Sequence, residues 1–248
     1  MPQDILSFPA NTDYSRGRFA IGACNRLAMD WLGRYPDWPG AVPGLIIHGE
    51  TGCGKSHLAH IWQETTQADI ITSLAPSFDF ADSAPASFMG GVEALDPDRC
   101  YVLDGVLPSD AWDDDAVFLC LERFAHKNKK GSGGLLILAE TPPASMPWQR
   151  ADVASRLSAM TTAPITAPDD FVLDAVIQKL ADDRKLLMDK EAIAYLLPRM
   201  ERRFSEAKRI VDGLDVLSMR AGRRVTLPLI KQFLNQPEIS DRVQDTLL

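Results

Sequence analysis

The segment Gly49–Ser56 (GETGCGKS) constrains the fold more strongly than any other part of the chain. It matches the pattern G-x-x-x-x-G-K-[ST] in full, follows an apolar run and precedes a helical pattern. In such a strand–loop–helix unit, glycines let backbone N–H groups converge on phosphate oxygens, while Lys55 reaches the terminal phosphates and Ser56 ligates Mg²⁺. A glycine turn that merely closes a βα unit is the alternative. The complete match in this context favours a phosphate-binding loop, with candidate residues Gly49, Thr51, Gly52, Cys53, Gly54, Lys55 and Ser56.

Short apolar runs alternate with helical segments, which is typical of a parallel sheet covered by helices. The pattern predicts a helix from Asn25 to about Tyr35 and strands over 45–48, 69–72, 100–103 and 135–138, with a weaker one over 164–166. After Pro168 the pattern is helical only, with capping residues before four segments. We therefore predict a polar tail over 1–18, a five-stranded α/β domain over 19–167 and a small all-α domain over 168–248.

An acidic residue after a neighbouring strand is the second element that a phosphate-binding loop needs, because it holds Mg²⁺ through water. Asp104 follows the apolar run 100–103, and its distance along the chain from the loop favours a magnesium role over that of an ordinary turn residue. The next residue is Gly105, where ring-forming ATPases commonly carry the carboxylate that polarises the attacking water. Intrinsic hydrolysis should therefore be slow.

The composition and net charge disfavour several classes of protein. There are 26 Lys and Arg against 34 Asp and Glu, a net charge of −8, so generic nucleic-acid binding is disfavoured. No apolar run approaches the length of a membrane span and the N-terminus lacks the pattern of a signal peptide, which predicts a cytoplasmic protein without membrane contact. The four scattered cysteines are expected to be reduced and mostly buried, and His57 and His60 to lie on a helix surface without a zinc set.

Several segments resemble the DnaA and Hda group of AAA+ ATPases. Residues 49–58 (GETGCGKSHL) extend the generic loop as that group does, and residues 19–22 with 25–28 are similar to its adenine-pocket segment. Residues 135–143 resemble the sensor-one strand, with Glu140 where the group usually has Asp. The resemblance covers residues 19–235 and implies a parallel AAA+ domain, a four-helix lid and ADP or ATP with Mg²⁺ as ligands. It adds to the nucleotide-site candidates Ile21, Gly22, His57, Glu140, Arg202 and Arg203.

The segment Asp152–Leu157 is similar to the motif that presents an arginine finger, which makes Arg156 the candidate to act in trans on a partner's ATP. Pairing with a surface carboxylate is the alternative for Arg156. The sensor-two position falls nearest Ser205, a departure from the group, so Arg202 and Arg203 just before it are the candidates for that role.

The tail contains Gln3-Asp4-Ile5-Leu6-Ser7-Phe8, which fits the clamp-binding peptide of Hda-like proteins, with Gln3, Leu6 and Phe8 as contacts. An ordinary tail whose Phe8 packs on the core is the alternative. The resemblance thus implies a regulator that, with the sliding clamp (the polymerase beta subunit), promotes hydrolysis of DnaA-bound ATP and restrains replication initiation. The chain is expected to lack the partner-binding and origin-reading domains of DnaA.

Two other functions stay open at this stage. One is an ATPase motor or helicase loader with its own hydrolysis cycle. Gly105 disfavours this function because it supplies no carboxylate to polarise the attacking water. The other is an adaptor that touches DNA through residues 199–248, which hold ten basic against seven acidic residues. Without a base-reading module we expect no sequence-specific DNA binding, and arginine fingers make a homo-oligomer possible.

Overall fold

In the computed structural model of the chain, the described residues are 14–74, 91–109, 111–125, 133–221 and 224–235. They divide into two compact units. The first unit is Ala23–Thr166, which we call the P-loop unit. The second, which we call the helical unit, combines the described residues up to Gly22 with those from Ala167 onwards.

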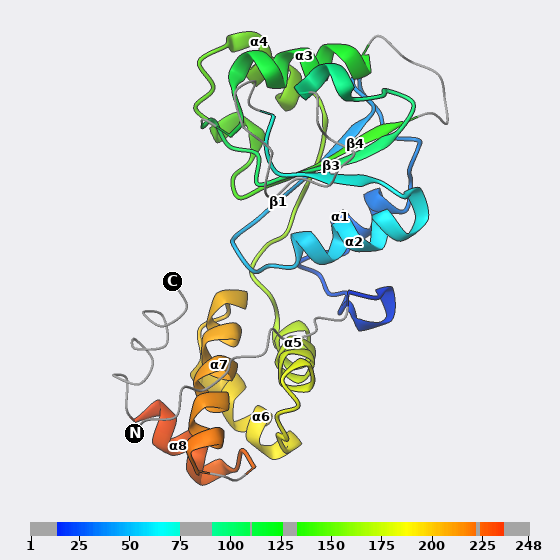
Figure 1. Ribbon diagram of the computed structural model, residues 1–248. Helices are drawn as coiled ribbons and strands as arrows, with labels where there is room; N and C mark the ends of the chain where they lie inside the picture. Colours follow the sequence, from blue (N-terminus) through cyan, green and yellow to red (C-terminus); the bar gives the residue numbers. More distant parts are fainter. Residues whose placement is uncertain (1–13, 75–90, 110, 126–132, 222–223, 236–248) are drawn as a thin grey trace, which may run out of the picture. The chain divides into compact units, whose positions relative to one another are not determined.

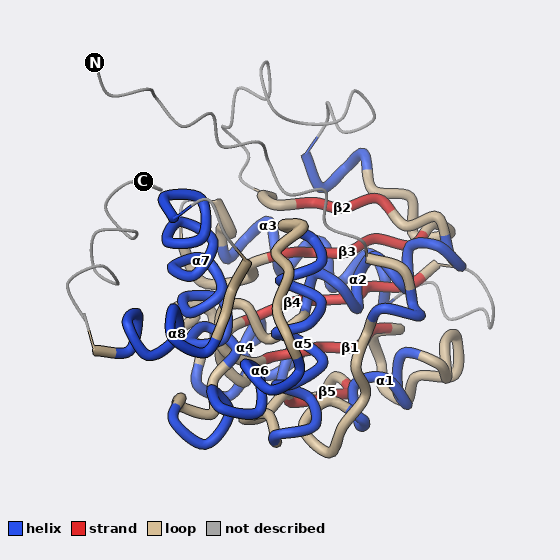
Figure 2. The backbone as a smooth tube through the Cα atoms, turned by 90° about the horizontal axis from the view of Figure 1, so that it is seen from below, coloured by secondary structure: helices blue, strands red, loops and turns tan. Residues whose placement is uncertain are grey.

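The described residues of the P-loop unit form a five-stranded sheet whose neighbouring strands run parallel. The strands follow the order β2-β3-β4-β1-β5 across the sheet (Figure 2). Strand β1 therefore lies inside the sheet, with Ile46 opposite Ile137 of β4 and Thr162 of β5. Their bounds are β1 Gly44–His48, β2 Asp69–Ile71, β3 Cys100–Asp104, β4 Gly134–Ala139 and β5 Thr161–Pro164.

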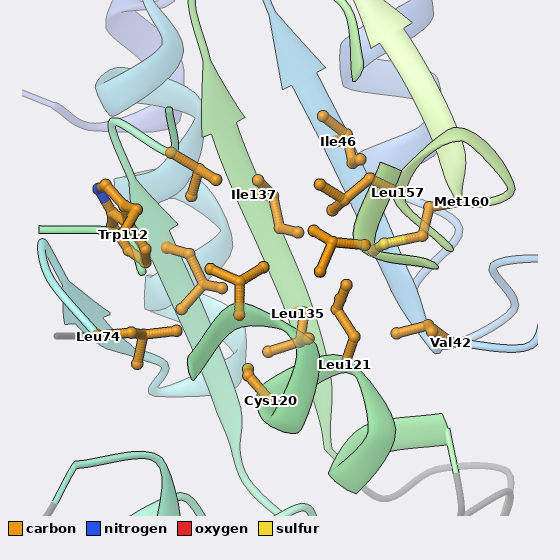
Figure 3. Packing of buried hydrophobic residues seen from close by; sticks show 14 of the residues in the cluster. Val42, Ile46, Leu74, Trp112, Cys120, Leu121, Leu135, Ile137, Leu157 and Met160 are labelled. Carbon is orange, nitrogen blue, oxygen red and sulfur yellow. The ribbon is translucent and has the colours of Figure 1, made fainter. Parts of the chain in front are cut away.

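Helices cover both faces of this sheet, so its central strands are mainly buried and apolar, apart from His48 and Asp104 at the ends of β1 and β3. Helices α1 (Arg26–Leu32) and α2 (Lys55–Thr66) lie on one face, and α3 (Asp114–Ala125) and α4 (Ala151–Ser158) lie on the other (Figure 1). Under α3 and α4, Leu121 and Leu157 pack with Ile137 and Leu135 of β4 (Figure 3). The predicted α/β fold class is confirmed. Short 3-10 helices are η1 Arg16–Arg18, η2 Gly91–Ala94, η3 Pro143–Ser145 and η4 Leu197–Arg199.

The helical unit contains four helices among its described residues, as the capping pattern predicts. They are α5 Asp170–Asp183, α6 Lys190–Leu196, α7 Phe204–Ala221 and α8 Leu227–Leu234. The side chain of Asp169 caps α5 by accepting a 2.9 Å hydrogen bond from the amide of Val172. Gly213 of α7 leaves the space that the Phe233 ring of α8 fills, because a Cβ there would lie 2.3 Å from that ring. One apolar core joins the four helices.

The segment 14–22 packs on helix α5 of the same unit. A Cβ on Gly22 would lie 2.3 Å from Cγ2 of Val172, and Arg18 pairs with Asp182 at 3.1 Å. The ammonium of Lys179 lies 5.4 Å from the ring centroid of Tyr14. Residues 19–22, which we expected in the α/β domain, thus group with the helical unit, where Gly22 packs on Val172.

Two local predictions were wrong. The fifth strand is Thr161–Pro164 rather than 164–166. Pairing with β1 determines its position, and the paired residues begin with two threonines that an apolar pattern does not identify as a strand. His57 is buried at 7% exposure instead of lying on the helix surface, because it joins Leu58, Ile61 and Trp62 on the buried side of α2. The four cysteines are buried and free, as predicted. No helix among the described residues is long and apolar enough to span a membrane.

Candidate nucleotide-binding site

The loop Gly49–Ser56 joins the end of β1 to the start of α2, and its glycines meet two different demands. Gly52 and Gly54 have φ of +80° and +99°, a left-handed conformation that glycine adopts without a steric penalty. Gly49 is required for space, because a Cβ there would lie 2.7 Å from the carbonyl oxygen of Ile165. The motif residues therefore shape the loop through both conformation and close approach.

The ammonium of Lys55 is folded back over this loop. Its Nζ donates to the carbonyl oxygens of Gly49 at 2.7 Å and Glu50 at 3.0 Å. Burial, together with the charge of Lys55, lowers the pKa of the neighbouring His48, so this imidazole is neutral at pH 7. A positive charge is thus held within the loop, on the side where the motif binds phosphate.

Cys53 contributes packing rather than thiolate chemistry. Its side chain is buried, and burial raises the pKa of the thiol above its ordinary value although the charge of Lys55 acts in the opposite direction. A thiol with a raised pKa is a weak nucleophile. We therefore assign Cys53 to the shape of the loop.

Asp104, at the end of β3, lies beside the first turn of α2. Burial raises the pKa of its carboxyl group, while the charge of Lys55, the Gly105 amide and the Ser56 hydroxyl all act to lower it. The hydroxyl of Ser56 and the carboxylate of Asp104 are the hard oxygen ligands that Mg²⁺ prefers. This donor set fits the predicted magnesium site, because a cation would stabilise the ionised form of the half-buried Asp104 carboxylate.

Gly105 continues the chain from β3 in a left-handed conformation with φ +78°. Its amide donates to the carbonyl oxygen of Leu138 at 3.1 Å, which ties the turn to β4. An acidic side chain at this position would be strained in the observed backbone. The absence of a carboxylate at position 105 therefore agrees with the backbone conformation there, which glycine adopts more readily than other residues.

Glu140 follows β4 and contacts the phosphate-binding loop directly, because the hydroxyl of Thr51 donates a hydrogen bond to its Oε1. Parallel strands place their carboxyl ends at one edge of a sheet, so β1, β3 and β4 bring the loop, Asp104 and Glu140 to that edge. The fold thus brings the nucleotide-site residues predicted within the P-loop unit together around the loop. His57 is the exception, since it is buried in the face of α2.

Arg156 lies on α4, where its guanidinium forms an ion pair with Glu122 of α3. Its Cζ also lies 5.3 Å from the ring centroid of Phe118. This intramolecular pair is the arrangement that the surface-carboxylate alternative predicted. The sequence reasoning missed Glu122 and Phe118, and no local signal points to them because they lie on a different helix from Arg156.

The other predicted nucleotide-site residues belong to the helical unit. Ile21 is 36% exposed, and Gly22 packs on Val172. Arg202 pairs with Asp170 at 3.1 Å, and Arg203 lies 3.9 Å from a carboxylate oxygen of Glu201. The clamp-peptide candidates Gln3, Leu6 and Phe8 lie outside the described residues.

Comparison with known proteins agrees with this architecture. Residues 172–234 match the family model described as "Hda, lid domain". An uncharacterized protein of Haemophilus influenzae is 26% identical over 200 residues, which cover 78% of this chain and 82% of that protein.

Solved structures share the fold. Domain III of the replication initiation protein DnaA from Thermotoga maritima matches with a TM-score of 0.67 at 18% identity, over 92% of this chain and 98% of that chain. AMPPCP-bound DnaA from Aquifex aeolicus matches with a TM-score of 0.61 at 18% identity, over 94% of this chain and 71% of that chain. The chain therefore shares the fold of the AAA+ domain of DnaA, and its residues 172–234 match the Hda lid-domain model.

Proposed function

We propose that the chain binds ADP or ATP with Mg²⁺ at the phosphate-binding loop. The observation that carries this proposal is the convergence of three features: the glycine-shaped loop, the Lys55 ammonium within it, and the Ser56 hydroxyl beside the Asp104 carboxylate. When bound, Mg²⁺ would neutralise phosphate charge, and Ser56 and Asp104 would hold it. The AMPPCP bound by the similar DnaA of Aquifex aeolicus supports an adenine nucleotide as the ligand.

We infer that the protein acts on a partner rather than through hydrolysis of its own. Gly105 leaves the loop without the neighbouring carboxylate that would polarise an attacking water, and its left-handed φ disfavours an acidic replacement. The Hda-type lid supports DnaA as that partner. In this proposal Arg156 enters the ATP site of DnaA and stabilises charge developing on the γ-phosphate, an effect worth roughly 10³–10⁵ in rate for fingers supplied in trans.

The proposed role also requires the DNA sliding clamp. The tail sequence Gln3–Phe8 would dock on the clamp as an extended peptide, which would restrict DnaA inactivation to DNA on which replication has begun. Deletion of residues 1–9 should abolish clamp binding and leave ADP affinity unchanged. Loss of both would mean that the tail belongs to the nucleotide-binding fold.

A phosphate-release assay tests the proposal as a whole. ATP-bound DnaA and clamp loaded on DNA are mixed with the protein, and hydrolysis is compared for wild type, Arg156→Ala and Arg99→Ala. Arg99 is the matched control, because it is also a partly exposed arginine of the P-loop unit in an ion pair, with Asp69 at 2.8 Å. Stimulation by wild type and Arg99→Ala, but not by Arg156→Ala, is the expected result.

Two outcomes would contradict the proposal. Equal stimulation by Arg156→Ala would remove the finger assignment. Rapid phosphate release by the protein in the absence of DnaA would instead favour a motor or loader with its own ATPase cycle.

A further inference from the structure

The face formed by α3 and α4 carries two arginines that are held differently. Both guanidiniums lie over the ring of Phe118, Arg150 at 4.1 Å and Arg156 at 5.3 Å from Cζ to the ring centroid. The two helices lie side by side on the same face of the sheet (Figure 1). Both arginines therefore contact the same aromatic ring, so differences in how firmly they are held come from the carboxylates around it.

Arg150 is fixed firmly and belongs to the fold. Its guanidinium donates to both oxygens of Asp152, at 3.1 and 2.8 Å, and also to Asp115. Its backbone amide donates to Oδ2 of Asp114 at 2.8 Å, just before α4 begins. A guanidinium engaged by two carboxylates is poorly suited to leave for an external anion, because both would be left without their cation.

Arg156 is fixed by a single carboxylate among the described residues, that of Glu122. Both side chains are partly exposed, 32% for Arg156 and 27% for Glu122, so solvent and an incoming group can reach the pair. Ion pairs with this exposure are weak, and a phosphate group can replace the carboxylate because it carries more charge and more acceptor oxygens. Arg156 is thus held in place but can be released.

We propose that Glu122 and Phe118 form a holding site for Arg156, and that the partner's triphosphate competes with Glu122 for the same guanidinium. In this arrangement Phe118 sets the plane of the guanidinium and Glu122 neutralises its charge until a partner docks. Glu122 is therefore a positioning residue that acts through Arg156. The second step rests on the proposed function, whereas the holding site is a property of this chain alone.

The holding site predicts a change in reactivity that needs no partner. Phenylglyoxal modifies accessible guanidinium groups, and peptide mass spectrometry can follow Arg150 and Arg156 separately in the intact protein. Glu122→Gln should speed modification of Arg156 about two- to five-fold, the range expected for loss of a partly exposed ion pair. Modification of Arg150 should not change, because its partners Asp115 and Asp152 remain in place.

The control variant is Asp69→Asn, which removes a carboxylate from another Arg pair of the P-loop unit. Asp69 is 29% exposed, close to the 27% of Glu122, and pairs with Arg99. It should leave Arg156 reactivity at the wild-type value. An unchanged Arg156 rate in Glu122→Gln, or an equal increase in both variants, would overturn the holding site.

The competition is tested in the phosphate-release assay by titrating each variant against ATP-bound DnaA. Glu122→Gln should lower the concentration for half-maximal stimulation about two- to five-fold and leave the maximal rate unchanged, whereas Asp69→Asn should change neither. A half-maximal concentration equal to that of wild type would overturn the competition. A failure of the proposed function itself shows differently, as an Arg156→Ala variant that stimulates as well as wild type.

Discussion

The P-loop unit and the helical unit carry different kinds of information about the chain. The P-loop unit holds a motif whose chemistry is shared by many unrelated nucleotide-binding proteins, so it indicates the ligand class and little about the partner. The helical unit has no such motif, yet it is the part that matches a specific family model, over residues 172–234. The motif that indicates a ligand class thus lies in one unit and the match to a family model in the other, and the following substitutions test this division.

The largest effect is expected from Lys55→Ala. Removing the ammonium that donates to Gly49 and Glu50 should weaken ADP binding about 100-fold, since lost charge-assisted phosphate contacts cost about 3 kcal/mol. Isothermal titration calorimetry measures this change. Lys208→Ala, which removes an exposed lysine of the helical unit paired with Asp212, is the control and should bind ADP like wild type.

The second-largest effect is expected on the stability of the helical unit, from a substitution in its core. Replacing a helical Gly by Ala normally stabilises a helix by about 1 kcal/mol, but at Gly213 the new Cβ would meet the Phe233 ring. We expect Gly213→Ala to lower the free energy of unfolding of this unit by about 1–3 kcal/mol. Gly17→Ala, where a Cβ has open space, should change it by less than about 0.5 kcal/mol. Stabilisation by Gly213→Ala in denaturant titrations would show that Phe233 moves aside at little cost.

Each unit contains a half-buried carboxylate, Asp104 in the P-loop unit and Asp215 in the helical unit. Burial raises the pKa of both Asp104 and Asp215, so each ionised carboxylate destabilises the folded protein above its folded-state pKa. This penalty disappears as the pH falls below the unfolded-state pKa, near 4. Asp104→Asn and Asp215→Asn should therefore each raise the free energy of unfolding at pH 7 and lose this gain in acid.

Nucleotide binding distinguishes the same two variants. Asp104→Asn should lose magnesium-dependent ADP affinity, because an amide oxygen is a weaker ligand than a carboxylate, whereas Asp215→Asn should retain it. Unfolding titrations across pH and ADP titrations with and without Mg²⁺ provide both measurements. If Asp104→Asn retained full magnesium dependence, Asp104 would have no role in the metal site.

The smallest effects are expected at the exposed arginines of the helical unit. Arg202→Ala removes an exposed ion pair with Asp170 and should change stability by less than about 0.5 kcal/mol. If Arg202 serves in nucleotide sensing, its removal should weaken ADP binding a few-fold, and Arg203→Ala tests its neighbour in the same way. Arg224→Ala, which removes a similarly exposed arginine paired with Asp189, is the matched control. Identical ADP affinities in all three variants would exclude both sensor candidates.

Local patterns predicted most of the framework. Strands β1 to β4 lie within one or two residues of the predicted ranges because each is a short apolar run bounded by polar or turn residues. Asp169 and Thr226, residue types typical of N-cap positions, directly precede α5 and α8. Strand β5 was misplaced because it begins with two threonines and contains no large apolar residue, and pairing with β1 rather than hydrophobicity defines its position.

The candidate site was predicted where its residues are adjacent in sequence or follow a strand. Gly49 to Ser56 form one segment, while Asp104 ends β3 and Glu140 directly follows β4. Contacts between helices gave no such signal, and Glu122 of α3 could not be matched with Arg156 of α4 from sequence. The burial of His57 was missed for the same reason, since only packing of α2 decides which side faces the core.

The amino-acid sequence alone determined the phosphate-binding loop, the alternation of strands and helices, and the change to helices after Pro168, because these depend on local spacing and residue type. The tertiary structure alone decided that segment 14–22 packs on α5 and that Arg156 is held by Glu122 over Phe118. These contacts join residues far apart in the chain. They form because folding brings the separate elements together, and no local pattern encodes the distance between them.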